Sequence, residues 1–318
     1  MNNYNNTFST DISKDHISTK GLPNIFRLLS ISHKVLADNL YMHSAKIFHE
    51  KQEMSVAWIN EEQQYDLTVG MLVTAQWSSK LISNVGQVLI NTLTPNTQPT
   101  ASLNIFETVP HKWVPVPAII KYAKTTFADL PAGFRLLFNA IFWEGNRFYR
   151  YLLTPNSVNQ QFSWHHGNIM HAIVVAKSAK ALAKGTSRES LAIMTLAALL
   201  NDAGKADDYI LNDNGNQYKP SNRMQLVGCK ITIIEWISAA IAKYDISISN
   251  DQYLLLLHTL LATADNKPPA FAKGISDEYK ILSKAQKFSI EYANIHNRPK
   301  YIDQGIKVSI EYSYFSNL

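Results

Sequence analysis

The chain has 318 residues, of which 46% are hydrophobic and 17% charged, proportions typical of a globular protein rather than a disordered one. This length is sufficient for two modest domains, each with its own core. A net charge of +5 permits an anionic partner without requiring one, because nucleic-acid readers are usually more basic, at least locally. The single cysteine excludes a disulfide framework and a zinc cluster built on cysteines.

The N-terminal segment MNNYNNTFSTDISKDH is polar and rich in asparagine, and it lacks the apolar core of a secretory signal. No apolar run reaches the roughly 18 residues that a membrane-spanning helix needs. We therefore expect a cytoplasmic protein without a membrane partner, with residues 1–20 as a flexible polar tail.

The first structured part of the chain is predicted to be helical and the next part to be β-structure. Apolar residues between Gly21 and Glu50 recur at helical spacing, so residues 1–50 are expected to hold the tail and one N-terminal helix. From Glu53 onward three short runs, MSVAWI, MLVTAQW and VGQVLINTL, have the composition and length of strands. We expect them to form a small OB-like β domain over residues 51–103.

Residues 104–163 are expected to be a connector that holds helices at Ile119 to Phe127 and at Gly133 to Ile141. The segment FWEGNRFYRYLL that follows is predicted to be a β-hairpin turning at Glu144-Gly145-Asn146. Residues 164–295 have helical periodicity almost throughout, and residues 296–318 are expected to be a tail. The expected helices are Ile169 to Leu182, Ser187 to Asp202, Gln225 to Tyr244, Asp251 to Ala264 and Ser276 to Ala293. The predicted fold class is α+β, with a small N-terminal OB-like β domain followed by an all-helical bundle.

The stretch LAIMTLAALLNDAGK, from Leu191 to Lys205, carries the strongest functional signal in the sequence. An apolar helix ends there in a carboxylate, and burying a carboxylate is costly unless a cation or hydrogen bonds compensate it. Asp202 and Lys205 are therefore candidate catalytic residues. The alternative is an ordinary helix end, because glycine suits a left-handed cap and lysine suits the helix dipole.

Three other segments support a functional role for LLNDAGK, the segment from Leu199 to Lys205. They are FRLLFNAIFWEGNRFYRYLLTPNS, GNIMHAIVVAKSAKALA and LLLLHTLLATADNKPP. Over roughly residues 53–290 the chain resembles the HD superfamily of metal-dependent phosphohydrolases. The resemblance is to a subgroup with an OB-like domain in front of the helical bundle, which includes YhaM-type exoribonucleases and TraI-type relaxase-like domains of conjugative elements. It implies a phosphodiester or nucleotide hydrolase ancestry, with single-stranded nucleic acid as the partner.

The resemblance also implies a divalent metal, Mn, Fe, Ni or Mg, which would polarise a phosphate and activate a water molecule. It assigns His171 to the early metal histidine, Asp202 to the aspartate of the His-Asp pair and His258 to a later histidine. His165 and His166, beside the glycine-rich turn, are further candidates through a shifted loop. Each of these histidines has a structural alternative, as a core residue or as part of a loop.

Several expected ligands are substituted in this chain. Asn201 replaces the histidine of the pair, Gln286 replaces the late aspartate, and Thr263 and Ala264 replace a second histidine cluster. A catalytic metal site normally needs at least three protein ligands, and two do not hold a divalent ion well. The sequence thus leads to an HD-like, nucleic-acid-related phosphohydrolase-like protein of a conjugative or integrative element, with an eroded metal site or no metal at all.

Two other functions stay open at the level of sequence. One is a non-catalytic nucleic-acid-binding or scaffold protein, and the other is an active metal-dependent phosphodiesterase or exonuclease that uses His165, His166 and Asp202. Trp58 and Trp77 in the β region are candidates for stacking on the bases of a single strand. The alternative for both rings is packing in the core of the β domain.

Overall fold

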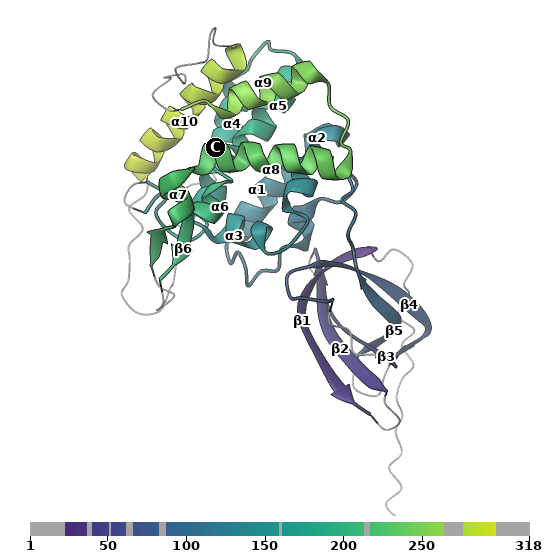
Figure 1. The fold of residues 1–318 in the computed structure, drawn as a ribbon. Coiled ribbons are helices and arrows are strands. Elements are labelled where there is room, and N and C mark those ends of the chain that lie inside the picture. Colours follow the sequence, from purple (N-terminus) through teal and green to yellow (C-terminus); the bar gives the residue numbers. More distant parts are fainter. Residues whose placement is uncertain are drawn as a thin grey trace, which may run out of the picture.

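The structure is a computed structural model. It describes residues 23–36, 40–50, 52–61, 66–82, 87–158, 161–212, 217–263 and 276–296. A five-stranded closed barrel is followed by a helical region, so the mixed α+β class predicted from the sequence is confirmed (Figure 1). The tail predicted for residues 1–20, the tail predicted for residues 296–318 except His296, and Ala264 lie outside the described residues. Among the described helices, none combines the length and low charge needed to cross a bilayer.

The barrel contains all of the strands that the β-like runs predicted, together with two more. Its strands are β1 (Ile25–Val35), β2 (Tyr41–His49), β3 (Gln52–Asn60), β4 (Leu72–Ile82) and β5 (Val88–Pro95). The strand order is β1-β2-β3-β5-β4, and antiparallel pairing of β1 with β4 closes the barrel. The β3–β5 pair is parallel and the other pairs are antiparallel.

The helix predicted between Gly21 and Glu50 is wrong, because this segment forms strands β1 and β2. Phe26 and Leu28 are fully buried in the barrel core, and the register pairs Phe26 with Val73 of β4. Apolar spacing in this segment fits a helix, but long-range pairing with β4 selects a strand. The predicted β domain of residues 51–103 consequently held only three of the five strands.

The longer helices of the helical region follow the sequence prediction closely, with the exception of α3. These are α1 (Pro117–Ala128), α2 (Ala132–Phe142), α3 (Arg147–Leu153), α4 (Gly167–Leu182), α5 (Arg188–Leu200), α8 (Cys229–Tyr244), α9 (Asn250–Leu260) and α10 (Asp277–His296). The short elements are the 3₁₀ helix η2 (Ile105–Thr108), the helices α6 (Lys205–Asp208) and α7 (Asn222–Leu226), and the strands β6 (Tyr209–Leu211) and β7 (Tyr218–Pro220).

The hairpin predicted around Glu144-Gly145-Asn146 is also wrong, because the turn joins helices α2 and α3. Gly145 has φ +63°, a left-handed conformation that a helix–helix turn uses as readily as a hairpin does. Phe148 and Tyr151, three residues apart, are both buried on one face of α3. Aromatic residues favour strands on average, but here their spacing places them in a helical core.

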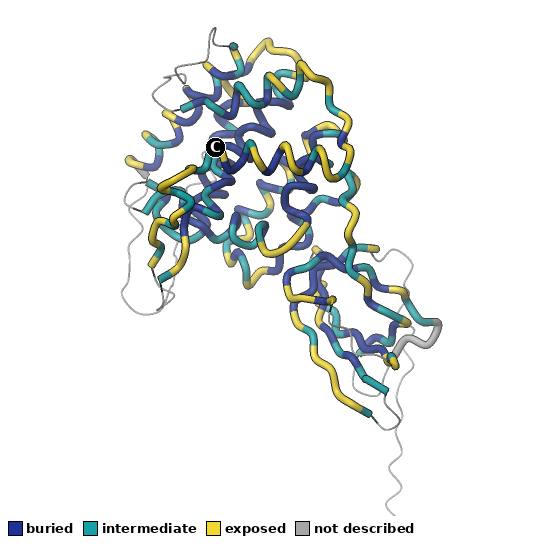
Figure 2. Tube along the Cα trace, in the orientation of Figure 1, coloured by how far each residue is buried: buried dark blue, intermediate teal, exposed yellow. Residues whose placement is uncertain are grey.

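Helices α4 and α5 form the centre of the helical region. Almost every residue from Gly167 to Ala179 is buried, as is every residue from Ala192 to Leu200. Figure 2 shows these buried positions in the interior, surrounded by helices with exposed outer faces. A helix that is apolar on all sides is an interior helix. Helices α1 to α3, from the predicted connector of residues 104–163, pack into the same core.

A buried arginine joins the barrel to the helical region. Arg27 of β1 is 1% exposed, and it donates hydrogen bonds to Thr108 Oγ1 at 2.7 and 3.2 Å and to the Gly70 carbonyl at 2.8 Å. Its guanidinium also lies over the rings of Trp113 and Phe148, 5.6 and 5.4 Å from their centroids. Burial lowers the pKa of Arg27 to about 9. The side chain of Arg27 thus contacts both the barrel and the helical region and helps to hold them together.

Candidate functional site

The candidate centre lies where helix α5 ends and the short helix α6 begins. Gly204, between them, packs directly on the backbone of Cys229 at the start of α8. A Cβ atom added at Gly204 would lie 2.3 Å from the Cys229 carbonyl oxygen. Gly204 has φ −58°, so it is needed for close approach and not for a left-handed cap. This contact places Lys230, the next residue of α8, beside the end of α5.

The carboxylate of Asp202 is surrounded by donors from the chain itself. Lys205 Nζ lies 3.2 Å from Oδ1, and His171 Nε2 lies 3.4 Å from Oδ2. Asn156 Nδ2 donates to Oδ2 at 3.0 Å, and Asn168 Nδ2 donates to the Asp202 backbone carbonyl at 3.1 Å. The Asp202 side chain is only 12% exposed. The internal cation and hydrogen bonds that the sequence called for are present.

A second lysine contacts the residue that precedes Asp202. Lys230 Nζ donates to the Asn201 side-chain oxygen and, at 3.2 Å, to the Asn201 carbonyl. It also lies 3.5 Å from the Ala262 carbonyl, which accepts a hydrogen bond from Gln286 Nε2 at 3.3 Å. Asn201 and Gln286, far apart in the sequence, are therefore linked through one lysine and one carbonyl group.

The charges at this centre are set by burial and by one another. Burial alone would raise the pKa of Asp202, but the charges of Lys205 and Lys230 hold it well below its usual range. Burial opposes the charge on Lys205, yet the attraction of Asp202 raises its pKa, whereas burial lowers the pKa of Lys230. Burial lowers the pKa of His171 to about 4, so its contact with Asp202 at neutral pH is that of a neutral imidazole.

His171 also contacts Ser289 of α10, with 3.1 Å between Nδ1 and Oγ. His258, which the resemblance assigned to the same metal, packs elsewhere on that helix. Its Nε2 accepts a hydrogen bond from the Ser276 backbone at 3.3 Å, and its ring lies 5.2 Å from that of Tyr279. Tyr279 and Ser289 are separated by about 15 Å along α10. The structure brings His171 to Asp202 and gives His258 a different set of contacts.

The pair His165 and His166 makes contacts away from Asp202. His166 is buried and has φ +69°, and its Nδ1 lies 2.9 Å from the Leu152 carbonyl. Burial lowers the pKa of His166 to about 4. His165 Nδ1 lies 3.2 Å from the hydroxyl of Tyr218. The ring of His166 thus contacts α3, and the ring of His165 contacts β7.

In the part of the chain that the structure describes, no group of three or more His, Cys, Asp or Glu side chains is arranged to hold a metal ion. The centre itself offers one carboxylate, one imidazole and two ammonium groups. Ammonium groups have no lone pair for a metal. Lys230 was not among the residues that the sequence singled out, although a lysine directly before the apolar run ITII, at the start of α8, is a signal that a search for buried charge would find.

Of the two tryptophans proposed to stack on bases, Trp58 belongs to the barrel core. It is 2% exposed and stacks on His43, with ring centroids 5.1 Å apart. The stacking prediction for Trp58 is wrong, because a base needs an exposed ring face. Trp77 is half-buried and packs edge-on against Phe26, with centroids 5.8 Å apart.

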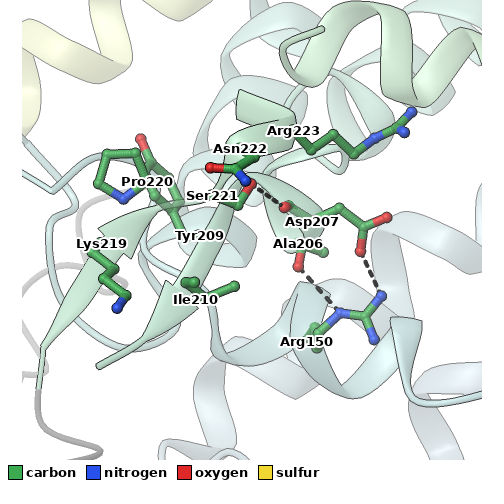
Figure 3. Close-up of a pocket in the computed structure, with 10 residues that line it drawn as sticks. All are labelled: Arg150, Ala206, Asp207, Tyr209, Ile210, Lys219, Pro220, Ser221, Asn222 and Arg223. Carbon is green, nitrogen blue, oxygen red and sulfur yellow. Dashed lines mark hydrogen bonds and ion pairs between the residues drawn. The ribbon is translucent and has the colours of Figure 1, made fainter. Parts of the chain in front are cut away.

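A cavity of about 800 Å³ lies beside the centre, where α3, α6, α7 and the β6–β7 pair meet (Figure 3). Arg150 is held there by Asp207 and by the Ala206 carbonyl. Arg223, also at its wall, pairs with Glu235. The arginines of this cavity are therefore engaged by acidic residues of the fold.

Comparison with known proteins does not extend these observations: no protein-family model matches the chain, and searches of curated proteins and of solved structures found no match either. The function must be argued from the geometry of the centre and of the cavities.

Proposed function

We propose that this chain is a metal-independent, non-hydrolytic binding protein, with an HD-like helical domain and an OB-like barrel. One observation carries the proposal. Lys230 bonds to Asn201 and shares the Ala262 carbonyl with Gln286, and both are positions at which the HD resemblance expects metal ligands. Asp202 and His171 occupy two further such positions, and they contact each other. A lysine ammonium takes the place of the metal ion among them.

Charge balance supports this proposal. A divalent metal would bring two positive charges to the carboxylate, and Lys205 and Lys230 bring the same number. Both lysines interact electrostatically with Asp202, and each is half-buried. A metal ion entering the centre would be repelled by two ammonium groups and would have to displace Lys205 and Asn156 from the Asp202 oxygens. The internal cations therefore replace the metal in compensating the buried acid.

The protonation states also argue against hydrolysis by Asp202 and Lys205. A general base works best with a pKa near the operating pH, whereas the pKa of Asp202 is far below its usual range. Lys205, whose pKa is raised, is a poor proton donor at neutral pH. Asp202 and Lys205, first identified as catalytic candidates, are thus assigned a structural role in which each stabilises the charge of the other.

Restoration of the ligands tests the proposal. The double variant Asn201→His, Gln286→Asp regains two ligand types, and the triple variant adds Lys230→Ala to remove the blocking cation. We expect dialysed wild-type protein to retain less than one divalent ion per chain by elemental analysis. In calorimetry the triple variant should bind Mn²⁺ at least about tenfold tighter than the double variant, since removing a nearby unit charge is worth more than about 1.4 kcal/mol.

Lys219→Ala in the double background is the matched control, because Lys219 lines the separate cavity of Figure 3. It should leave Mn²⁺ affinity unchanged. Stoichiometric metal that survives dialysis of the wild-type protein would contradict the proposal. A folded triple variant that binds Mn²⁺ no better than the double variant would contradict the proposal as well.

Single-stranded nucleic acid is the ligand that we propose for the barrel. A small five-stranded closed barrel is the architecture of OB-like domains, which commonly bind single strands. Trp77 is the remaining stacking candidate, and stacking contributes roughly 1–3 kcal/mol per base. In fluorescence anisotropy with oligo(dT) and oligo(rU), Trp77→Ala should weaken binding about tenfold, whereas Trp77→Phe should retain most of it. The absence of binding by the intact protein at low salt would remove this assignment.

A further inference from the structure

A second basic region lies on the other side of the helical core, where α1 ends and α2, α4 and α5 meet. Two cavities of about 540 and 510 Å³ adjoin there and share Pro131, Arg188 and Ala192. We call them together the Arg135–Arg188 groove. Each volume is within the range of sites for small molecules, about 300–1,000 Å³.

The first half of the groove is positively charged and incompletely paired. Its wall contains Arg135, Lys180 and Arg188, and its single acid is Asp129. Asp129 is already paired with Lys180, with 2.7 Å between Oδ2 and Nζ. Among the ion pairs between described residues, none includes Arg135 or Arg188. Two guanidinium groups therefore line the cavity without an ion pair to any carboxylate of the described residues.

Arg135 has an additional unsatisfied group. Its Nε atom is buried, and no described atom accepts its hydrogen. A buried donor without an acceptor costs about 1–3 kcal/mol. The start of α2 adds to the positive potential, since its N-cap, Pro131, makes no side-chain capping hydrogen bond. Together these groups favour a negatively charged ligand.

The second half of the groove has an apolar wall. Pro131, Phe134 and Ile248 line it, together with Gly133. The acid here, Glu189, accepts a hydrogen bond from Gln252 at 2.7 Å and so has a partner other than the arginines. A ligand that spans both halves has an anionic end and an apolar or aromatic end.

We propose that the Arg135–Arg188 groove binds a phosphorylated small molecule of nucleotide size. Its phosphates contact Arg135 and Arg188, because the planar guanidinium fork matches phosphate oxygens. Its base or other flat apolar group lies against Pro131 and Ile248, which are both at least partly exposed. The cavity of Figure 3 is less suited to a phosphate, because its arginines, Arg150 and Arg223, are already paired with Asp207 and Glu235. The assignment is independent of the metal-free centre and of the barrel ligand.

Isothermal titration calorimetry on the full chain at low salt tests this site, with inorganic phosphate, pyrophosphate and ADP as probes. We expect ADP to bind at least tenfold tighter than inorganic phosphate. Arg188→Ala and Arg135→Gln should each weaken ADP binding at least tenfold. Lys219→Ala removes the same charge from the cavity of Figure 3 and should change ADP affinity less than twofold. Circular dichroism verifies that each variant is folded, and Arg188, an exposed residue, is the variant least able to disturb the core.

Three results would overturn the proposal. One is the absence of heat with pyrophosphate and ADP for folded wild-type protein. Another is an equal loss of affinity in Lys219→Ala and Arg188→Ala, which would indicate a general charge effect. The third is binding of an oligonucleotide without terminal phosphates that Arg188→Ala weakens, together with no detectable binding of ADP. This result would assign the arginines to a polynucleotide instead.

Discussion

The Asp202 centre and the Arg135–Arg188 groove both gather positive charge, but they differ in where the compensating negative charge comes from. In the centre, Lys205 and Lys230 are half-buried and the fold supplies Asp202. In the groove, the fold supplies no carboxylate to either arginine among the described residues. Buried charges must be compensated within the chain, because desolvation is costly. Charges that face an open cavity remain hydrated and need no partner until a ligand binds. Stability should therefore depend on the centre and binding on the groove.

The largest effect is expected for Asp202→Asn, which leaves the half-buried Lys205 and Lys230 without their anion. Breaking a buried ion pair by removing one partner costs about 3–5 kcal/mol in the free energy of unfolding. Urea denaturation at neutral pH measures it. The control Asp277→Asn removes an acid from an exposed pair with Lys280 and should cost less than about 1 kcal/mol. Equal losses in the two variants would show that water, rather than the fold, compensates the centre.

The next effect concerns the close approach that brings Lys230 to the centre. Gly204→Ala places a Cβ atom 2.3 Å from the Cys229 carbonyl, so α6 and α8 must separate. We expect a loss of about 2–3 kcal/mol in the free energy of unfolding, as for other overpacked sites. Gly133→Ala, at the wall of the groove, meets only the Ser247 carbonyl at 3.8 Å and should cause no loss. Similar stability of both variants in urea denaturation would mean that the α6–α8 contact is adaptable.

This difference between the two regions also shows how far the sequence alone can predict the structure. Strands β3 to β5 and most long helices were predicted, because each carries its own apolar period. Strands β1 and β2 were not, because the pairing of Phe26 with Val73 and of Ala45 with Val56 decides their form. The spacing of leucines within a segment does not show whether the segment pairs with a strand that lies far along the chain.

The candidate site was predictable only in part for the same reason. His171 and Asp202 lie in recognisable segments, and the structure brings them within 3.4 Å. Lys230 reaches the centre through the packing of Gly204 on Cys229, which no local pattern encodes. Arg135 and Arg188 belong to different helices, so their shared cavity and their lack of partners are visible only in three dimensions.

A pH titration sharpens the comparison further, because His171 is buried in the centre without a charge. Its pKa is lowered to about 4, below the ordinary value of 6.5, so the unfolded chain binds more protons between these pH values. Stability should fall as the pH falls from about 6.5 to 4. The slope for one group reaches about 1.4 kcal/mol per pH unit.

Other buried groups contribute to the same pH window. His166, with its pKa lowered to about 4, has the same sign as His171. Burial raises the pKa of Asp208 to about 6. Its contribution to stability therefore has the opposite sign and decreases as the pH rises. Comparison of His171→Gln with wild-type protein isolates one histidine: urea denaturation at several pH values should give a slope smaller by up to about one proton. His111→Gln, at an exposed residue, is the control, and an unchanged slope in His171→Gln would show that its imidazole is solvated.

The smallest effect on stability is expected for Arg188→Ala, which removes an exposed charge that has no ion-pair partner among the described residues. Without a ligand, its free energy of unfolding should lie within about 0.5 kcal/mol of the wild-type value. With ADP at about 100 times its Kd, the wild-type protein should gain roughly 2.7 kcal/mol. A tenfold weaker site gains about 1.4 kcal/mol less at the same concentration. Urea denaturation with and without ADP measures both quantities, and Lys219→Ala should gain as much as the wild type. If Arg188→Ala destabilises the free protein as strongly as Asp202→Asn does, the groove serves the fold in the way that the centre does, and the distinction between the two regions is lost.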